Sequence, residues 1–476
     1  MTTVAQVRPA PGRAAAVPGV RWAAVAALVA ALVRVPFLTR PLGPDEGGYL
    51  LVASQWSPGR SLYGAYFVDR PPLLVALFGL ADQLGGTVAL RLLGIAAVVV
   101  AVLLAGRLGG TTAAVLCAAL LSTPLFDGLE IDGELLAVPL VLGSFLLVLR
   151  SVRGRTETDR YLAPFAAGLL AAAAALVKQN IVDGVVVAAV LLLGLVLQRR
   201  WRDAGTRAAA FGAGALAATA LALGYADRRG TSPRGLWDAL VTFRAQAAAV
   251  IHASAAGSTP ERFHTLLLAG LLAGVPAVVA AALADLRRPL REPTVLTAAV
   301  VVLVWEAAGA LLGGSYWPHY LIALVPGLVL LVSATGSGRW LRLATGYAVA
   351  CAGLTLVLAL AHPLRMASDN AVADYVRARS GPTDTMAVAF GHPDIVRAAG
   401  LQSPYEHLWS LTARVRDPRL QELTGLMTTA HAPRWIVVDG DSLATWGIDA
   451  TQADAVLAQH YREVTVVGDW HVYEHR

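Results

Sequence analysis

Long apolar runs recur along most of the chain and predict helices that cross a membrane. Runs long enough to span about 30 Å of hydrocarbon lie at residues 22–38, 87–106, 111–126, 134–150, 161–177, 181–198, 208–225, 263–284, 294–312, 319–335 and 340–361. The pattern therefore predicts about eleven transmembrane helices. A further run at 71–84 is shorter and carries Asp82, so we expect a re-entrant or surface-lying helix there.

The pattern changes at Pro363, beyond which apolar runs shorten and charged residues become frequent. We expect helices at 369–379, 418–429 and 451–460, and strands at 385–390, 435–438, 463–467 and 470–473. This alternation predicts a small α/β layer. The expected organisation is an N-terminal tail at 1–20, a membrane domain at 21–363 and a soluble α/β domain at 364–476.

Composition supports a membrane protein and excludes several other classes. Hydrophobic residues make up 56% of the chain and charged residues only 15%, whereas soluble chains carry roughly 25% charge. We therefore expect a polytopic α-helical membrane protein. Cys117 and Cys351 both lie inside apolar runs, which favours packing over a disulfide or a thiolate metal site. The net charge is +6, and almost all of the basic residues are arginines. In a membrane protein such residues indicate which loops face the cytoplasm, so we expect no nucleic-acid partner.

The charged residues of the connections predict the orientation of the bundle. Arginines gather on one side of the expected helices, at positions 8, 13, 21, 150, 153, 155, 160, 199, 200, 202, 207, 287, 288, 291, 339 and 342. Basic residues of short loops stay on the cytoplasmic side. We therefore expect a multi-pass protein of the cell membrane with a cytoplasmic N-terminus. The opposite, extracytoplasmic side receives a long loop at about 226–262 and the C-terminal domain.

An adjacent pair of acids, Asp45 and Glu46, follows the first expected helix within the sequence Gly-Pro-Asp-Glu-Gly-Gly-Tyr. Carboxylates near hydrocarbon are costly unless they face water, a partner or a substrate, so acids at this position suggest a functional site. The alternative is a solvated turn built on Pro-Asp-Glu-Gly.

Other polar residues fall on the same extracytoplasmic side. They are Asp69 and Arg70 before a Pro-Pro pair, the acids Asp127, Glu130, Asp132 and Glu134, then Lys178, and His319 with Tyr320. Several acids together with a few cations suit a reaction in which a carboxylate removes a proton from an acceptor. The cations would then hold an anionic leaving group.

Lys178 is the only lysine among the 38 basic residues. A compact ammonium group on a flexible stem is a common ligand for phosphate. The alternative is a lysine that extends from a helix end toward water. His319 also has a plain alternative, as a helix cap or a packing residue, and its place opposite the acidic connection favours a functional role.

The order of these motifs resembles the GT-C superfamily of polyprenyl-phosphate-sugar glycosyltransferases. The resemblance rests on Pro-Asp-Glu-Gly-Gly-Tyr at 44–49, Arg-Pro-Pro-Leu at 70–73 and Ala-Leu-Arg-Leu-Leu-Gly at 89–94. It is to the branch that includes protein O-mannosyltransferases and lipid A aminoarabinose transferases, and it covers about residues 21–335. Arg70 stands where many relatives have histidine. The C-terminal domain looks like that of many actinobacterial transferases.

The resemblance implies roles for individual residues. Asp45 matches the catalytic general base, and Glu46 matches its companion. A second acid would be Glu134 or Asp132, and the sequence leaves that choice open. Lys178, the pair His319 and Tyr320, and Arg70 would meet the donor phosphate.

The implied reaction moves a hexosyl or pentosyl group from a polyprenyl-phosphate donor to a cell-envelope glycan, lipid or protein, with inversion at the anomeric carbon. The resemblance assigns no definite cofactor, and cationic residues or a bound divalent cation could replace a general acid. The alternatives are a transporter or flippase, whose sites tend to lie near the membrane midplane, and a scaffold that displays the C-terminal domain. Few charged residues lie at the centres of the expected helices, which argues against a transporter. Glu306 is the main exception.

Overall fold

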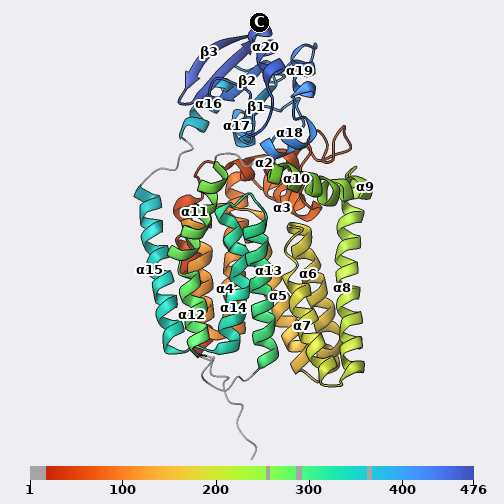
Figure 1. The fold of residues 1–476 in the computed structure, drawn as a ribbon, viewed down its shortest axis with the longest axis vertical. Helices are drawn as coiled ribbons and strands as arrows, with labels where there is room; N and C mark the ends of the chain where they lie inside the picture. The colour runs from red at the N-terminus through yellow and green to blue at the C-terminus, as the bar shows by residue number, and fades with distance from the viewer. Residues whose placement is uncertain (1–17, 254–257, 286–291, 362–366) are drawn as a thin grey trace, which may run out of the picture.

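A helical bundle carries a small α/β domain at one end in the computed structural model (Figure 1). The structure describes residues 18–253, 258–285, 292–361 and 367–476. The predicted N-terminal tail, up to residue 17, therefore lies outside the described residues.

The bundle is built from helices that bury alanine, leucine and valine against one another. Its long helices are α1 (Pro18–Leu32), α4 (Thr87–Ser122), α5 (Gly133–Arg153), α6 (Ala163–Val177), α7 (Asp183–Leu197), α8 (Trp201–Arg228), α11 (Ser258–Leu272), α12 (Val275–Asp285), α13 (Pro293–Leu312), α14 (Leu324–Thr335) and α15 (Arg339–Ala361). Their apolar side chains also cover the outside of the bundle, as lipid contact requires.

Helix α4 turns back on itself. Gly109 and Gly110 have non-helical backbone angles, with φ of 71° at Gly110. A Cβ atom on Gly106 would lie 3.5 Å from the Cβ of Ala114, although eight residues of straight helix span about 12 Å. Near the start of α4, Arg91 Nη1 donates a hydrogen bond of 2.7 Å to the carbonyl oxygen of Leu129, which follows its end. The two arms of this hairpin correspond to the predicted runs at 87–106 and 111–126.

Within the described ranges, seven helices are long and apolar enough to cross a membrane, or eight if α11 and α12, bent by 46°, form one span. That number counts α4 once, and it leaves out the 15-residue helices α1 and α7. The chain is a polytopic helical membrane protein, as expected. The predicted total of about eleven spans stays a prediction.

Short helices form a layer between the bundle and the C-terminal domain (Figure 1). They are α2 (Pro44–Ser54), α3 (Pro72–Gln83), α9 (Pro233–Trp237), η4 (Asp238–Thr242) and α10 (Phe243–Ala253). The short apolar run at 71–84 is α3, and it lies at the end of the bundle.

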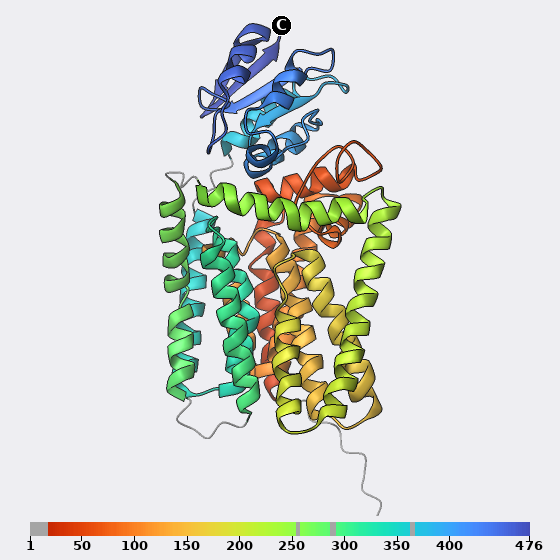
Figure 2. The ribbon, with the colours of Figure 1, turned by 45° about the vertical axis from the view of Figure 1, so that its right-hand side comes forward.

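The prediction of a long loop at 226–262 is wrong, because α9, η4 and α10 run across the end of the bundle as one helical rod (Figure 2). The rod begins where Ser232 Oγ accepts a hydrogen bond from the Gly235 backbone nitrogen. Its buried residues are Leu236, Ala239, Phe243, Ala247 and Ile251. Their spacing of three or four residues makes a narrow apolar stripe, which a search for continuous apolar runs misses.

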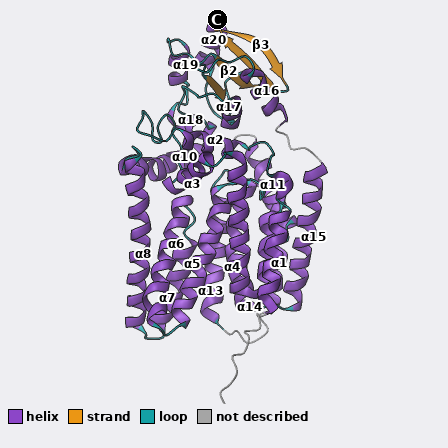
Figure 3. Cartoon of the chain, turned by 180° about the vertical axis from the view of Figure 1, so that it is seen from behind, coloured by secondary structure: helices purple, strands orange, loops and turns teal. Residues whose placement is uncertain are grey.

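The C-terminal domain is a four-stranded sheet with helices packed on it (Figure 3). Its elements are α16 (Ala367–Arg377), β1 (Met386–Ala389), α17 (Pro393–Ala399), α18 (Ser410–Arg416), α19 (Gln421–Met427), β2 (Trp435–Asp439), α20 (Thr451–His460), β3 (Tyr461–Val467) and β4 (Trp470–His475). The strand order is β1-β2-β4-β3; β1 and β2 are parallel, and the other pairs are antiparallel. The predicted strands and α/β class are confirmed, whereas α17 and α18 were not predicted.

Candidate functional site

The expected loop at Asp45 and Glu46 is the first turn of α2. Pro44 opens the helix, where a missing backbone N–H costs nothing. Gly43 precedes it, and its backbone nitrogen donates a hydrogen bond of 3.0 Å to Glu46 Oε2. Neighbouring residues of a helix point about 100° apart, so the two acids of the pair face different surroundings.

Glu46 points into the protein. Its carboxylate is fully buried, accepts a hydrogen bond of 2.7 Å from the Ile131 backbone nitrogen, and forms an ion pair of 2.7 Å with Arg91. Burial raises the pKa of Glu46, and Arg91 opposes that shift. These contacts join α2 to the start of α4 and to the segment around Ile131. The side chain of Glu46 therefore points away from that of Asp45.

Asp45 is partly exposed, and both of its carboxylate oxygens accept hydrogen bonds. Trp409 Nε1, in the C-terminal domain, donates to Oδ1 at 2.9 Å. Tyr49 Oη, one helical turn further along α2, donates to Oδ2 at 3.2 Å. Burial raises the pKa of Tyr49, so its hydroxyl remains a donor. Asp45 is therefore held between α2 and the C-terminal domain.

The glycines after the acid pair allow this close docking. A Cβ atom on Gly47 would lie 2.5 Å from Asp394 Cα, and one on Gly48 would lie 2.4 Å from Trp409 Cζ2 and 2.5 Å from Pro393 Cγ. No side chain fits at such distances, so the Gly-Gly pair explains how α17 and Trp409 reach the backbone of α2.

Arg70 continues the hydrogen-bonded chain that starts at Asp45. Its Nε donates to Tyr49 Oη at 3.0 Å, and its Nη1 bonds Asp69 Oδ1 at 2.8 Å. The other oxygen of Asp69 binds Arg244 of α10 at 2.8 Å. Asp69 thus holds two arginines side by side, and one of them is linked through Tyr49 to Asp45.

Lys178 follows the end of α6 and forms an ion pair with Glu134, in the first turn of α5. The ammonium nitrogen also lies 4.9 Å from the centre of the Tyr320 ring. His319 lies beside this pair, with Nε2 at 3.9 Å from Glu134 Oε1. Burial lowers the pKa of Lys178, and Arg70 lowers it further, so an anion nearby would stabilise the ammonium form.

Arg70, Glu134, Lys178 and Tyr320 line a cavity of about 160 Å³ at the end of the bundle that faces the C-terminal domain (Figure 1). His319, which was also predicted to meet the donor phosphate, is not part of this lining. The lining consists of Arg70, Glu134, Lys178, Gln179, Asn180, Arg244, Glu306, Gly309, Ala310, Gly313, Tyr320 and Ala323. Three of these side chains are cations, two are acids, and Tyr320 contributes a phenol. We refer to this space as the basic cavity. It suits a phosphate group more than a neutral ligand because the three cations converge on it.

The structure separates the two candidates for the second acid. Glu134 lines the basic cavity. Asp132 instead caps α5, since its Oδ1 accepts a hydrogen bond of 2.8 Å from the Leu135 backbone nitrogen. Burial raises the pKa of Asp132.

A cation site at this place would use Asp132, Glu134 and His319, whose ligand atoms lie within 4.8 Å of one another. Glu134 is already paired with the ammonium group of Lys178, so a metal ion would have to displace that cation. The residues fit a metal poorly while this pair is intact.

Sequence reasoning missed Tyr49, Trp409 and Arg244. Trp409 and Arg244 are far from Asp45 and Asp69 in sequence, and Arg244 lies in the segment that was expected to be a loop. Tyr49 stands at the fourth position after Asp45, and this spacing would have indicated contact if α2 had been recognised as a helix.

Comparison with known proteins bears on the fold. No family model matches the chain, and no curated protein matches its sequence. ArnT from Cupriavidus metallidurans bound to undecaprenyl phosphate is similar in structure, with a TM-score of 0.60 at 16% identity over 96% of this chain and 98% of that one. This likeness shows that the chain has the same overall fold as that structure.

Two further structures are more distant from this chain. ArnT in the apo state has a TM-score of 0.49 at 15% identity, over 96% of this chain and 98% of that one. The archaeal oligosaccharyltransferase AglB from Archaeoglobus fulgidus, in complex with an inhibitory peptide and a dolichol-phosphate, has a TM-score of 0.45 at 15% identity, over 88% and 69%.

Proposed function

We propose that this protein is a membrane glycosyltransferase that moves a sugar from a polyprenyl-phosphate donor to an extracytoplasmic acceptor. The observation that carries the proposal is the connection between a carboxylate and a cluster of cations. Asp45 is linked through Tyr49 to Arg70, and Arg70 lines the basic cavity with Lys178 and Arg244. The similar fold of ArnT, solved with undecaprenyl phosphate bound, supports a lipid-phosphate donor.

Asp45 acts as the general base in this proposal. The acceptor hydroxyl attacks the anomeric carbon and gives its proton to the Asp45 carboxylate, while the bond from that carbon to the phosphate oxygen breaks. The bonding electrons leave with the polyprenyl phosphate, and the configuration inverts. Trp409 and Tyr49 hold the carboxylate in one orientation through their hydrogen bonds, which is the positioning that such a step requires.

The basic cavity would hold the phosphate. Arg70, Lys178 and Arg244 would neutralise the charge that grows on the leaving oxygen, so no general acid is needed. Glu134 would position Lys178 through their ion pair, and the Tyr320 ring would support the ammonium group. Glu46 has a structural role in this account, because its partners are Arg91 and two backbone nitrogens.

The two other classes explain less of the geometry. Glu306, the acid that most favoured a transporter, lines the same basic cavity as Lys178. It therefore belongs to the proposed phosphate site and gives no support for a separate transport site. A scaffold would not require the C-terminal domain to donate a hydrogen bond to Asp45. In the proposed orientation, this site lies on the extracytoplasmic side of the cell membrane and the N-terminus lies in the cytoplasm.

The test is transfer of radiolabel from a panel of polyprenyl-phosphate hexoses and pentoses, in membranes with and without the protein. We expect one donor to label an envelope glycan, lipid or protein. Movement of an intact labelled donor across the membrane, with no transfer from any donor, would instead favour the transporter.

A further inference from the structure

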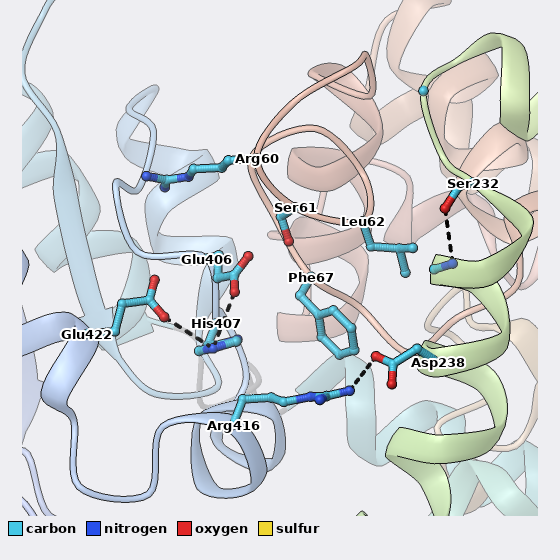
Figure 4. A pocket seen from close by; sticks show the side chains of 12 residues that line it. Arg60, Ser61, Leu62, Phe67, Ser232, Asp238, Glu406, His407, Arg416 and Glu422 are labelled. Atoms are coloured by element: carbon cyan, nitrogen blue, oxygen red, sulfur yellow. Dashed lines mark hydrogen bonds and ion pairs between the residues drawn. The ribbon is translucent and has the colours of Figure 1, made fainter.

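A second pocket lies between the C-terminal domain, the loop at 58–67 and the start of the α9–α10 rod (Figure 4). Its volume is about 530 Å³. Figure 4 shows His407 with Glu406 and Glu422 on the side of the C-terminal domain, and Ser61 and Leu62 on the facing loop. None of its lining residues lines the basic cavity.

Two carboxylates converge on one imidazole nitrogen in this pocket. His407 Nε2 lies 3.6 Å from Glu406 Oε1 and 3.6 Å from Glu422 Oε2. One ligand atom from each residue can be chosen so that all three lie within 4.8 Å of one another. Ligands about 2.1 Å from a tetrahedral metal ion are about 3.4 Å apart, so two of the separations already match coordination, and a small rotation of a glutamate completes the set.

The separations within this cluster are too long for hydrogen bonds. Arg60 also lines the pocket, and its Nη2 donates a hydrogen bond to the Pro404 carbonyl oxygen. His407 is only 3% exposed, and its Nδ1 has no hydrogen-bond partner within the described chain. The imidazole of histidine is a common ligand of zinc-class metal ions. The nearby Arg416 is engaged by Asp238 at 2.6 Å. Two carboxylates therefore face a buried histidine.

We propose that Glu406, His407 and Glu422 bind a divalent transition-metal ion of the zinc class. One nitrogen and two oxygen ligands suit such an ion, and a fourth position remains open toward the pocket. The ion would join the segment before α18 to α19, because Glu406 and His407 precede α18 and Glu422 lies in α19. The site is separate from the proposed transfer reaction, and it does not depend on that reaction.

The experiment measures zinc directly. Purified full-length protein in detergent is equilibrated with zinc at a series of buffered free concentrations; bound zinc per chain is read by elemental analysis, and Tm is read with and without zinc. The variants are His407→Ala and Glu422→Gln. The second changes a half-exposed side chain, so it should fold even if the first does not. Asp441→Asn is the control, because it removes a 97% exposed carboxylate from the same domain.

We expect the wild-type protein to bind one zinc ion that neither ligand variant binds at the same free zinc concentration. The affinity for this ion should be about 10-fold or more lower in each variant. Zinc should raise Tm of the wild type and of Asp441→Asn more than that of either ligand variant, since a ligand of the folded state stabilises it. Equal zinc content and equal Tm shifts in wild type, His407→Ala and Glu422→Gln would overturn the proposal. Absence of zinc binding by the wild type would also overturn it.

Discussion

Replacing Gly48 by alanine should uncouple the C-terminal domain from the helix that carries Asp45. The new Cβ atom would lie 2.4 Å from Trp409 Cζ2, and carbon atoms in contact prefer about 3.5 Å or more. The indole must therefore move by roughly 1.1 Å, the difference between these two distances. The new Cβ atom would also lie 2.5 Å from Pro393 Cγ, so a second residue of the docked domain must shift together with Trp409.

The expected result is a large loss of activity with a moderate loss of stability. Trp409 Nε1 holds Asp45 Oδ1, and a displacement near 1 Å in a catalytic arrangement costs about 10²-fold in rate. Overpacking of this size costs about 1–3 kcal/mol of folding free energy. Sugar transfer per folded protein and Tm measure the two effects separately.

Gly79→Ala is the matched control. It lies in α3, where a Cβ atom would have its nearest neighbour at 3.7 Å, and alanine favours a helix over glycine by about 1 kcal/mol. We expect normal transfer from that variant. Normal transfer from Gly48→Ala as well would refute the reasoning that docking of the C-terminal domain positions Asp45.

Three further predictions test the basic cavity, the buried acid and the topology. Lys178→Ala and Arg244→Ala should each raise the donor KM, because both cations line the cavity. Lys178→Ala should also lower Tm, since it leaves the buried Glu134 without its ion-pair partner. An unchanged KM in both variants would remove the two residues from phosphate binding. Glu46→Gln should lower the free energy of unfolding by about 3–5 kcal/mol, since it leaves Arg91 buried without its ion-pair partner. The folded variant should keep its turnover. A stable variant with no turnover would contradict the structural role of Glu46. An impermeant thiol reagent applied to intact cells should label Thr428→Cys and not Arg202→Cys, and the reverse pattern would invert the orientation.

Much of the fold could be predicted because periodicity and length report burial directly. Continuous apolar runs predicted both arms of the α4 hairpin, and the short runs after Pro363 predicted all four strands of the C-terminal sheet. The α9–α10 rod was missed because it buries only a narrow stripe around Leu236 and Phe243. Such a stripe is recognised by spacing and not by total hydrophobicity.

The site could be predicted only in outline. Helix ends on one side of a membrane bring their polar residues to one surface, and this predicted Lys178 and Glu134 on the same surface without predicting their ion pair. Asp45 and Glu46 face different surroundings because α2 begins at Pro44. The sequence pattern predicted a loop at this position, so it could not separate the roles of the two acids. The contact of Trp409 with Asp45 spans 364 positions, and no local pattern encodes it.

The most direct measurement of the central claim is sugar transfer by Asp45→Asn. The amide keeps the shape of the carboxylate and can still accept a hydrogen bond, but it cannot take the acceptor proton. With the donor found in the panel, we expect turnover to fall by about 10² or more, with donor binding and Tm close to wild type. Near-normal turnover in this variant would contradict the assignment of Asp45 as the base and, with it, the proposed mechanism.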